Sequence, residues 1–342
     1  MEFVKLRHPV RDLGAEDARL AGILSPGYSQ AEVNRHIHAL FQEKYQEYMK
    51  PFPLTREGID HWKEMIRALL PASHADVNAP FTILDLGSGE GTSVFPLLEV
   101  FPNAEVIASD LSTNLLRELR RWHGEHCPAR RLHVLQQNVE AMVFEDSQID
   151  IVTGAQVLHH LANVRQAFME IHRILKPGGI AVFWDGFEIG CQIVSLVLQL
   201  LAARNETVPS AERIPSPVIA GFLEFTDGIV RRRGGRKDES QLEAMDDKWI
   251  FTETQLRTAL SGTGLKLTEI RPTHSSGHGL ISLMVNHELR RRLLDLQMLP
   301  AWARALVDDV ERQFSDELKS EILYGGVIML TRPGTDERLA MA

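Results

Sequence analysis

The chain has 342 residues, of which 44% are hydrophobic and 24% are charged, and this balance is ordinary for a globular protein. Its formal net charge of −9 argues against a nucleic-acid partner, because proteins that bind nucleic acids usually carry basic patches. The two cysteines can form neither a disulfide framework nor a metal site, and no other metal site is expected. The longest apolar stretch, residues 189–203, is too short to cross a bilayer, and the first ten residues lack the apolar core of a secretory signal. We therefore expect a cytoplasmic protein without stable membrane insertion.

Two helices are predicted in the N-terminal part of the chain. The capping box Ser-Gln-Ala-Glu at residues 29–32 predicts a helix that continues to Met49, and residues 56–70 form a second predicted helix. Tyr45 and Tyr48 lie three residues apart on the first helix and therefore share one face. These tyrosines are candidates for substrate contact, with ordinary packing as the alternative.

A glycine-rich turn follows the first predicted strand of the central region. Residues 80–84 are an apolar, β-branched run that predicts a buried strand, and Asp-Leu-Gly-Ser-Gly-Glu-Gly at residues 85–91 leads into a predicted helix. A dinucleotide fingerprint needs its third glycine five residues after the first, where this chain has Thr92. The third glycine is Gly91, one position early. Alone, this turn is compatible with a nucleotide-like ligand other than a dinucleotide, or with a tight turn that binds nothing.

Three further strands follow, each with polar residues at its end. Residues 104–110 form a predicted strand that ends in Asp110, whose carboxylate either accepts hydrogen bonds from a ribose or caps the next helix. Residues 132–135 form the next predicted strand, and Asn138 follows it. The strand predicted at residues 149–153 leads into Gly-Ala-Gln-Val-Leu-His-His-Leu at residues 154–161.

Together with Lys-Pro-Gly-Gly at residues 176–179 and the apolar strand after it, these segments resemble the class I S-adenosylmethionine (SAM) dependent methyltransferases. The resemblance is to the small-molecule branch that includes the quinone-biosynthesis enzymes. It implies an α/β, Rossmann-like, doubly wound sheet of seven strands in the order 3-2-1-4-5-7-6, with the last strand antiparallel. It also implies SAM as cofactor and S-adenosylhomocysteine (SAH) as product.

The resemblance also implies a set of cofactor-binding residues. Asn138 stands where the family usually has an acid, so its amide oxygen would meet the adenine amino group without charge assistance. The methionine end of SAM would lie against the glycine turn, the ribose at the end of the second strand and the adenine after the third. The implied residues are Asp85, Gly87, Gly89, Gly91, Asp110, Leu111, Asn138, Val139 and Ala155.

Helical additions surround this core. An apolar helix predicted at residues 189–203 either packs in a core, lines a pocket for a bulky apolar substrate or forms a homodimer interface. The last two strands are predicted at residues 265–272 and 321–332, and the long stretch between them contains helical patterns. The predicted divisions are an N-terminal helical lid segment (1–79), a SAM-binding core (80–186), a helical lid insertion (187–251) and the C-terminal part of the sheet (252–342) with a helical insertion at about 273–320.

Methyl transfer needs alignment of donor and acceptor, and a hydroxyl or carbon acceptor also needs a base, whereas a thioether or carboxylate does not. His159 and His160, which follow the fourth strand, are candidate bases, although such a pair also occurs without that role. Asp185 and Glu188 either orient an acceptor or cap the apolar helix, and His274 either reaches the acceptor or lies in an exposed loop.

The expected function is methyl transfer to a small molecule, at an O, N, S or C atom that the sequence leaves open. The alternatives are a methyltransferase for a glycan or a lipid-linked intermediate, and a catalytically silent SAM-binding protein that acts through a partner. A dehydrogenase is a more distant alternative.

Overall fold

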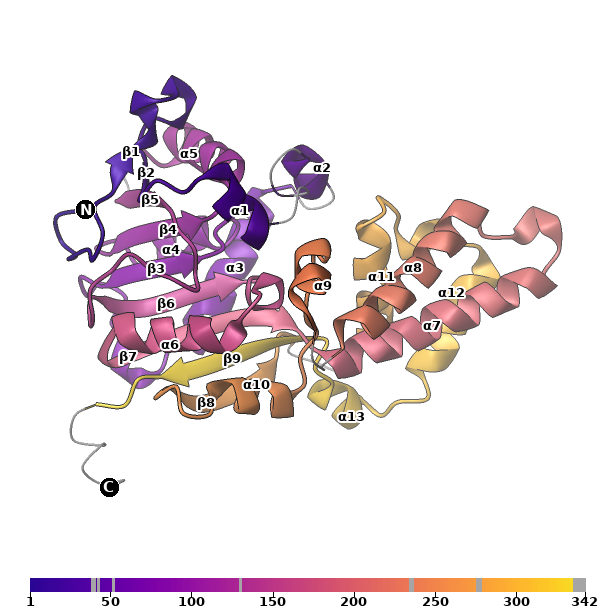
Figure 1. The fold of residues 1–342 in the computed structure, drawn as a ribbon. Helices are drawn as coiled ribbons and strands as arrows, with labels where there is room; N and C mark the ends of the chain where they lie inside the picture. Colours follow the sequence, from indigo (N-terminus) through magenta and orange to yellow (C-terminus); the bar gives the residue numbers. More distant parts are fainter. Residues whose placement is uncertain are drawn as a thin grey trace.

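The computed structural model describes residues 1–37, 41, 44–50, 53–128, 131–233, 237–274 and 279–334. These residues form one mixed β-sheet with helices on both faces, and a helical lobe lies beyond one end of the sheet (Figure 1). The strands are β1 (Arg11–Asp12), β2 (Ile23–Ser25), β3 (Thr82–Leu86), β4 (Glu105–Asp110), β5 (Leu132–Gln136), β6 (Ile149–Ala155), β7 (Leu175–Gly186), β8 (Lys266–Pro272) and β9 (Gly325–Thr331). The α-helices are α1 (Gln30–His36), α2 (Tyr45–Met49), α3 (Arg56–Leu69), α4 (Val94–Val100), α5 (Thr113–His126), α6 (Val164–Ile174), α7 (Glu188–Thr207), α8 (Ser216–Arg232), α9 (Glu239–Ala244), α10 (Glu253–Leu260), α11 (Leu280–Arg290), α12 (Ala301–Glu311) and α13 (Asp316–Glu321).

The sheet has nine strands in the described ranges, in the order β1-β2-β5-β4-β3-β6-β7-β9-β8, so the prediction of seven was wrong. The two extra strands come from the N-terminal segment, which is therefore not only helical. β2 pairs parallel to β5, and β1 pairs antiparallel to β2. Strands of two and three residues are too short to show the alternation by which a strand is recognised in a sequence.

Two apolar layers cover the central strands. Successive residues of β3 point to opposite faces, so that Ile83 and Leu84 belong to different core clusters. Helices α3, α4 and α5 pack on the Ile83 face, and α6 and α10 pack on the Leu84 face. The parallel strands β3 to β7 are thereby buried on both sides, and their carboxyl ends share one edge where ligands bind in such folds.

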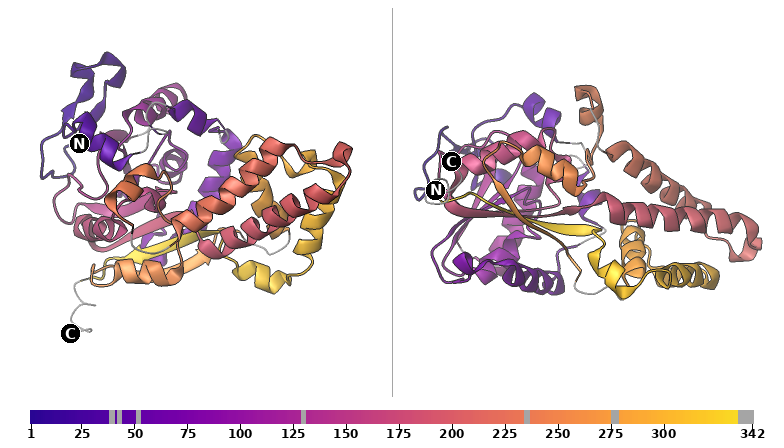
Figure 2. Two further views of the ribbon diagram at one scale, coloured as in Figure 1. Left: turned by 45° about the vertical axis from the view of Figure 1, so that its right-hand side comes forward. Right: turned by 90° about the horizontal axis from the view of Figure 1, so that it is seen from below.

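The two predicted helical insertions form a single lobe rather than separate additions. Helices α7 and α8 come from the segment after β7, and α11 and α12 come from the segment between β8 and β9. All four contribute to one buried cluster, through residues that include Leu198, Phe222, Ile281 and Val307. Figure 2 shows this lobe projecting as one body beyond the end of β7. No helix in the described ranges is long and apolar enough to span a membrane.

The first predicted helix is interrupted. The capping box at Ser29 and Glu32 is present, but α1 ends at His36, and Ile37 adopts an extended backbone. A second helix, α2, then covers Tyr45–Met49. A capping box specifies where a helix begins and says nothing about its length, which explains why the prediction of one helix to Met49 was wrong.

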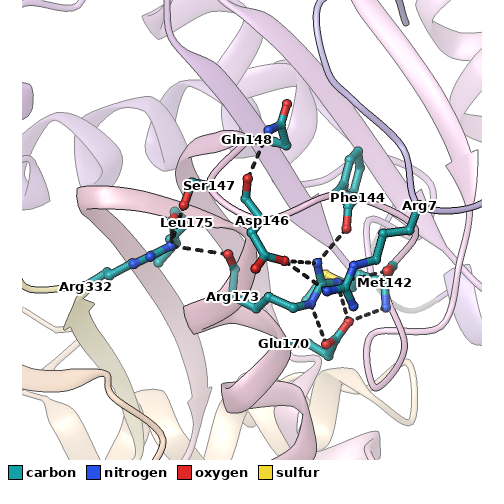
Figure 3. A network of polar contacts seen from close by, with 10 residues as sticks. All are labelled: Arg7, Met142, Phe144, Asp146, Ser147, Gln148, Glu170, Arg173, Leu175 and Arg332. Carbon is teal, nitrogen blue, oxygen red and sulfur yellow. Dashed lines mark hydrogen bonds and ion pairs between the residues drawn. The ribbon is translucent and has the colours of Figure 1, made fainter.

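A polar network anchors the amino end of β6, away from the edge where ligands bind. Figure 3 shows Arg173 of α6 at its centre, where the guanidinium donates to the carbonyls of Met142 and Phe144 at 3.0 and 2.6 Å. Glu170 accepts from the same guanidinium at 2.7 Å. Arg332, just after β9, donates to Ser147 Oγ at 2.9 Å. The network joins α6, the loop before β6 and the chain after β9.

Candidate active site

The glycine turn after β3 leaves open space at one of its three glycines. Gly87, Gly89 and Gly91 all have positive φ angles of 64°, 52° and 107°. A Cβ atom on Gly87 would lie 2.6 Å from Val157 Cγ2, and one on Gly91 would lie 2.3 Å from the Phe95 ring. A Cβ on Gly89 would meet nothing within 4 Å. Gly87 and Gly91 are therefore required by packing, whereas Gly89 faces the space available to a ligand.

Asp85 lies beneath this turn rather than on its surface. The side chain is fully buried, and its two oxygens accept hydrogen bonds from Thr153 Oγ1 at 2.7 Å and Ser93 Oγ at 2.8 Å. Burial raises the pKa of the Asp85 carboxyl. The expected direct contact with the methionine end of SAM therefore needs correction. Asp85 joins β3 to β6 and to the start of α4, and thus supports the turn from below.

Asp110 at the end of β4 faces the glycine turn. Its carboxylate accepts from the backbone N–H groups of Gly89 at 3.0 Å and Ser112 at 2.8 Å. Ser112, not Asp110, provides the side-chain cap of α5, so the alternative reading of Asp110 as the helix cap is wrong. Burial and, to a smaller extent, the nearby Glu90 raise the pKa of Asp110 to about 6, although these hydrogen bonds act in the opposite direction.

Glu90, inside the glycine turn, is a site residue that the sequence analysis missed. Burial raises its pKa, and its Oε1 accepts from Thr92 Oγ1 at 3.0 Å. Within the described residues, neither Glu90 nor Asp110 forms an ion pair. Two neighbouring carboxylates without a cation favour a positively charged ligand, and SAM carries both an ammonium and a sulfonium group. The residues present therefore fit SAM.

The predicted adenine side contains a second residue that the sequence analysis missed. Asn138 N–H donates to the Tyr28 hydroxyl at 2.9 Å, while Asn138 Oδ1 accepts from the backbone N–H of Glu140 at 2.9 Å. Val139 is buried, and the Leu111 carbonyl accepts from Gln136 Nε2 at 3.1 Å. Tyr28 belongs to the segment between β2 and α1 and could not be linked to this place by sequence alone.

His159 is held between two carboxylates. Its Nδ1 lies 2.7 Å from Asp185 Oδ1, and its Nε2 lies 3.4 Å from Asp247 Oδ1. Burial alone would lower the pKa of His159, but the charges of Asp185 and Asp247 outweigh it and raise the pKa to about 10. His159 is therefore an imidazolium at neutral pH and has no lone pair for a proton. This geometry argues against the predicted role of His159 as a base.

His160 has the opposite electrostatic environment. Burial and the charge of His159 lower its pKa to about 3, so its ring is neutral. The Nδ1 atom lies 3.1 Å from the carbonyl oxygen of Asp246, which can only accept a hydrogen bond. Nδ1 therefore carries the proton, and Nε2 carries the lone pair. The Phe41 ring packs edge-on against this imidazole, with 4.9 Å between ring centroids.

The remaining predicted residues lie at different places. Asp185 is fully buried, and its Oδ2 has no hydrogen-bond partner in the described part of the chain. Glu188 pairs with Arg233 Nε at 3.1 Å, and His274 Nε2 bonds to the Lys319 carbonyl at 3.0 Å, so neither points to the histidine pair by its contacts. The Tyr45 hydroxyl accepts from Arg117 at 2.7 Å. The side chain of Tyr48 lies outside the described residues.

Asp247 is the third residue that the sequence analysis missed. One ligand atom from each of His159, His160 and Asp247 lies within 4.8 Å of the others, a grouping that the expectation of no metal site did not consider. Both nitrogens of His159 already face carboxylates, and Arg232 Nη1 binds Asp247 Oδ2 at 2.6 Å. The cations present therefore balance this cluster, and we assign no metal ligands here.

Comparisons with known proteins agree with this geometry. Residues 84–183 match the family described as a methyltransferase domain. The chain is 29% identical over 159 residues to the ubiquinone/menaquinone biosynthesis C-methyltransferase of Hahella chejuensis, covering 45% of this chain and 61% of that protein. It is 30% identical over 151 residues to the malonyl-[acyl-carrier protein] O-methyltransferase of Legionella pneumophila, covering 44% of this chain and 50% of that protein. The chain thus spans less than two thirds of either relative.

Among solved structures, phosphoethanolamine N-methyltransferase 2 of Haemonchus contortus superimposes with a TM-score of 0.51. The match covers 90% of this chain and 61% of that one at 17% identity, which shows the shared fold. Residues 84–183 thus match a methyltransferase domain, and this part of the chain is similar to the methyltransferases of quinone biosynthesis. The resemblance and the cofactor predicted from the sequence are thereby confirmed.

Proposed function

We propose that this protein transfers the methyl group of SAM to a small-molecule acceptor. The observation that carries the proposal is the arrangement at the glycine turn. Gly89 faces open space, and Asp110 and Glu90 beside it form no ion pair with a described residue. A cationic nucleoside satisfies both the space and the charge.

The cofactor supplies a methyl group that is already activated by positive sulfur, so the protein mainly has to align donor and acceptor. We propose that Gly89 and Asp110 contact the methionine and ribose parts. Leu111, Asn138, Val139 and Ala155 would surround the rest of the nucleoside. Gly87, Gly91 and Asp85 would maintain the turn from beneath.

The acceptor would lie beside the histidine pair, where β6 and β7 end and the helical lobe begins. One face of α7 packs inside the helical lobe, where Val194, Val197 and Leu198 are buried in the core. On the other face, Ile189, Leu196 and Leu200 are 55%, 58% and 42% exposed. Packing in the core of the lobe therefore explains the buried apolar residues of α7 but not its exposed ones. A homodimer through the exposed face stays a prediction, as does the cytoplasmic location.

The two curated relatives are named for a C-methyltransferase and an O-methyltransferase, which suggests that a test should cover several kinds of acceptor. Purified protein would be incubated with SAM and a panel of phenols, quinols, amines, thiols and carboxylic acids, with SAH formation as the readout. We expect SAH to form with at least one small acceptor, and we expect Asp110→Asn to slow its formation when SAM is limiting. Tight SAH binding without turnover on any acceptor would instead support a silent cofactor-binding protein.

A further inference from the structure

The histidine pair is held by a segment far from it in sequence. Residues 245–251 follow α9 and lead to Phe251, which forms an isolated parallel bridge with Phe187 just after β7. The backbone N–H groups of Lys248 and Trp249 donate to the His159 carbonyl at 2.8 and 3.2 Å. The Asp246 carbonyl bonds to His160, and the Asp247 carboxylate faces His159. One short segment therefore contacts the backbone of His159 and the rings of both histidines.

Asp247 is itself fixed in direction. Its Oδ2 binds Arg232 Nη1 of α8 at 2.6 Å, which leaves Oδ1 facing His159 Nε2. On the other side of the ring, Asp185 Oδ1 accepts from His159 Nδ1 at 2.7 Å. Two carboxylates thus enclose one imidazole, and both of its nitrogens are directed at oxygen.

The charges around the pair are nearly balanced. The charged and titratable groups that face it come from β7, α7, α8 and residues 245–251, and are Asp185, Cys191, Arg232, Asp246, Asp247 and Lys248. Burial raises the pKa of Cys191 to about 12, so that its thiol is uncharged. The carboxylates of Asp185 and Asp247 are matched by Arg232 and an imidazolium at His159. Asp246 Oδ1 and Asp247 Oδ1 also lie 3.6 and 3.7 Å from His160 Nδ1, but burial and the positive charge of His159, whose ring centroid is 4.0 Å away, outweigh them and keep His160 neutral.

We propose that Asp247 is a positioning residue which, with Asp185, keeps His159 protonated, so that His160 stays neutral and presents Nε2 as the base for an acceptor with an acidic O–H group. This inference rests on the proposed methyl transfer and names the class of acceptor for it, a phenol, enol or similar hydroxyl compound. Thioethers and carboxylates need no such base.

The step balances in atoms and charge. The acceptor oxygen gives its proton to His160 Nε2 and forms a bond to the methyl carbon, while the electron pair of the broken S–C bond remains on sulfur. The products are the methyl ether, SAH and a protonated His160, which then releases its proton to solvent. His159 keeps its proton throughout and acts through its charge and its contacts.

The protonation states can be measured without knowing the acceptor. In protein labelled with ¹⁵N-histidine, the ring nitrogen signals distinguish an imidazolium from either neutral tautomer, and His159→Gln and His160→Gln assign the two residues. We expect His159 to be an imidazolium and His160 a neutral ring with its proton on Nδ1, both near pH 7. A neutral His159 near pH 7, or a proton on Nε2 of His160, would overturn the proposal, and both states are read from the wild-type protein once the signals have been assigned.

Variants then test the role of Asp247. In Asp247→Asn we expect His159 to lose its proton at a pH about one to three units lower, because one of two carboxylate neighbours is removed. Asp247→Glu should restore the titration in part, and Glu253→Gln, on the exposed start of α10, is the matched control that should leave it unchanged. An unchanged titration in Asp247→Asn would contradict the proposal, as would a shift of both histidines on addition of Zn²⁺ alone.

Calorimetry with SAH separates this inference from the proposed function. If wild-type protein fails to bind SAH, the proposed function fails, whereas the histidine titration still reports on Asp247. If SAH binds equally to wild type and Asp247→Asn, a loss of turnover on phenols in the variant belongs to the histidine pair. Equal turnover of phenols by wild type and Asp247→Asn would overturn the role assigned to Asp247.

Discussion

Gly89 and Gly91 stand two positions apart in one turn, yet their surroundings assign them different tasks. A Cβ on Gly91 would overlap the Phe95 ring at a φ of 107°, whereas a Cβ on Gly89 would enter open space at a φ of 52°. We expect Gly91→Ala to lower the free energy of unfolding by about 2 kcal/mol or more, from strain and overpacking together. Gly89→Ala should cost only about 1 kcal/mol.

For cofactor binding we expect the opposite order, with Gly89→Ala more damaging than Gly91→Ala. Because the added methyl of Gly89→Ala projects into the ligand space, SAH affinity should fall at least about tenfold while the melting temperature changes little. Thermal unfolding and SAH titration of both variants provide the measurement. Equal loss of stability in the two variants would mean that Gly89 is a packing residue as well.

Asp110 predicts how cofactor binding depends on pH. Its raised pKa of about 6 means that the carboxyl is ionised above that pH and protonated below it. Only the ionised form can accept hydrogen bonds from both ribose hydroxyls with full charge assistance. SAH affinity should therefore fall as the pH drops from about 7.5 to about 5, by roughly tenfold, the factor by which the ionised form is depleted.

Asp110→Asn is the control for this pH dependence. The variant should bind SAH weakly at both pH values, with a flat profile, because the titrating group has been removed. A wild-type affinity that is constant across this pH range would contradict the assignment of Asp110 to the ribose.

At the scale of elements, Arg173 links α6 to the loop before β6. Its side chain is only 14% exposed, and its removal would leave the carbonyls of Met142 and Phe144 without this donor. We expect Arg173→Ala to destabilise the protein by about 2–4 kcal/mol in urea unfolding, the usual cost of breaking a buried polar network. Arg121→Ala is the matched control on α5.

Arg121 forms ion pairs with Glu118 and Glu125 on its own helix, so that, like Arg173, it has acidic partners. The side chain of Arg121, however, is 58% exposed. Exposed ion pairs contribute little, so Arg121→Ala should cost less than about 1 kcal/mol. Similar losses in the two variants would show that the network in Figure 3 contributes no more than surface pairs do.

Local signals predicted most elements of the sheet core, because each has its own pattern. The capping box at Ser29 begins α1 as expected, and apolar runs coincide with β3, β4 and β6. The very short β1 and β2 have no such pattern. They exist because β5 offers a free edge, a feature that arises only when the sheet has formed.

At the scale of the whole molecule, the candidate site combines near and distant parts of the chain. Gly89, Asp110 and the histidine pair were predictable because motif spacing and strand ends carry that information. Tyr28 and Asp247 were not, since each reaches the site through a segment whose path depends on tertiary packing. Asp247 lies 88 positions after His159 in the chain (247 − 159), so the sequence around His159 does not indicate this contact.

The shared core of the helical lobe predicts cooperative behaviour of two insertions. Phe222 of α8 is 1% exposed and belongs to the cluster that also contains Ile281 and Val307. Phe222→Ala should cost about 3–5 kcal/mol and should increase hydrogen exchange in α7, α8, α11 and α12 together, while β3 to β6 stay protected. Faster exchange confined to α8 would contradict a single lobe.

The most direct test of the account is a calorimetric titration with SAH, because the proposed function depends on a SAM site at the glycine turn. We predict one SAH bound per chain in wild-type protein, at least about tenfold weaker binding in Asp110→Asn and Gly89→Ala, and no competition from NADH. Preferential binding of NADH, or SAH binding that both variants leave unchanged, would contradict the central claim.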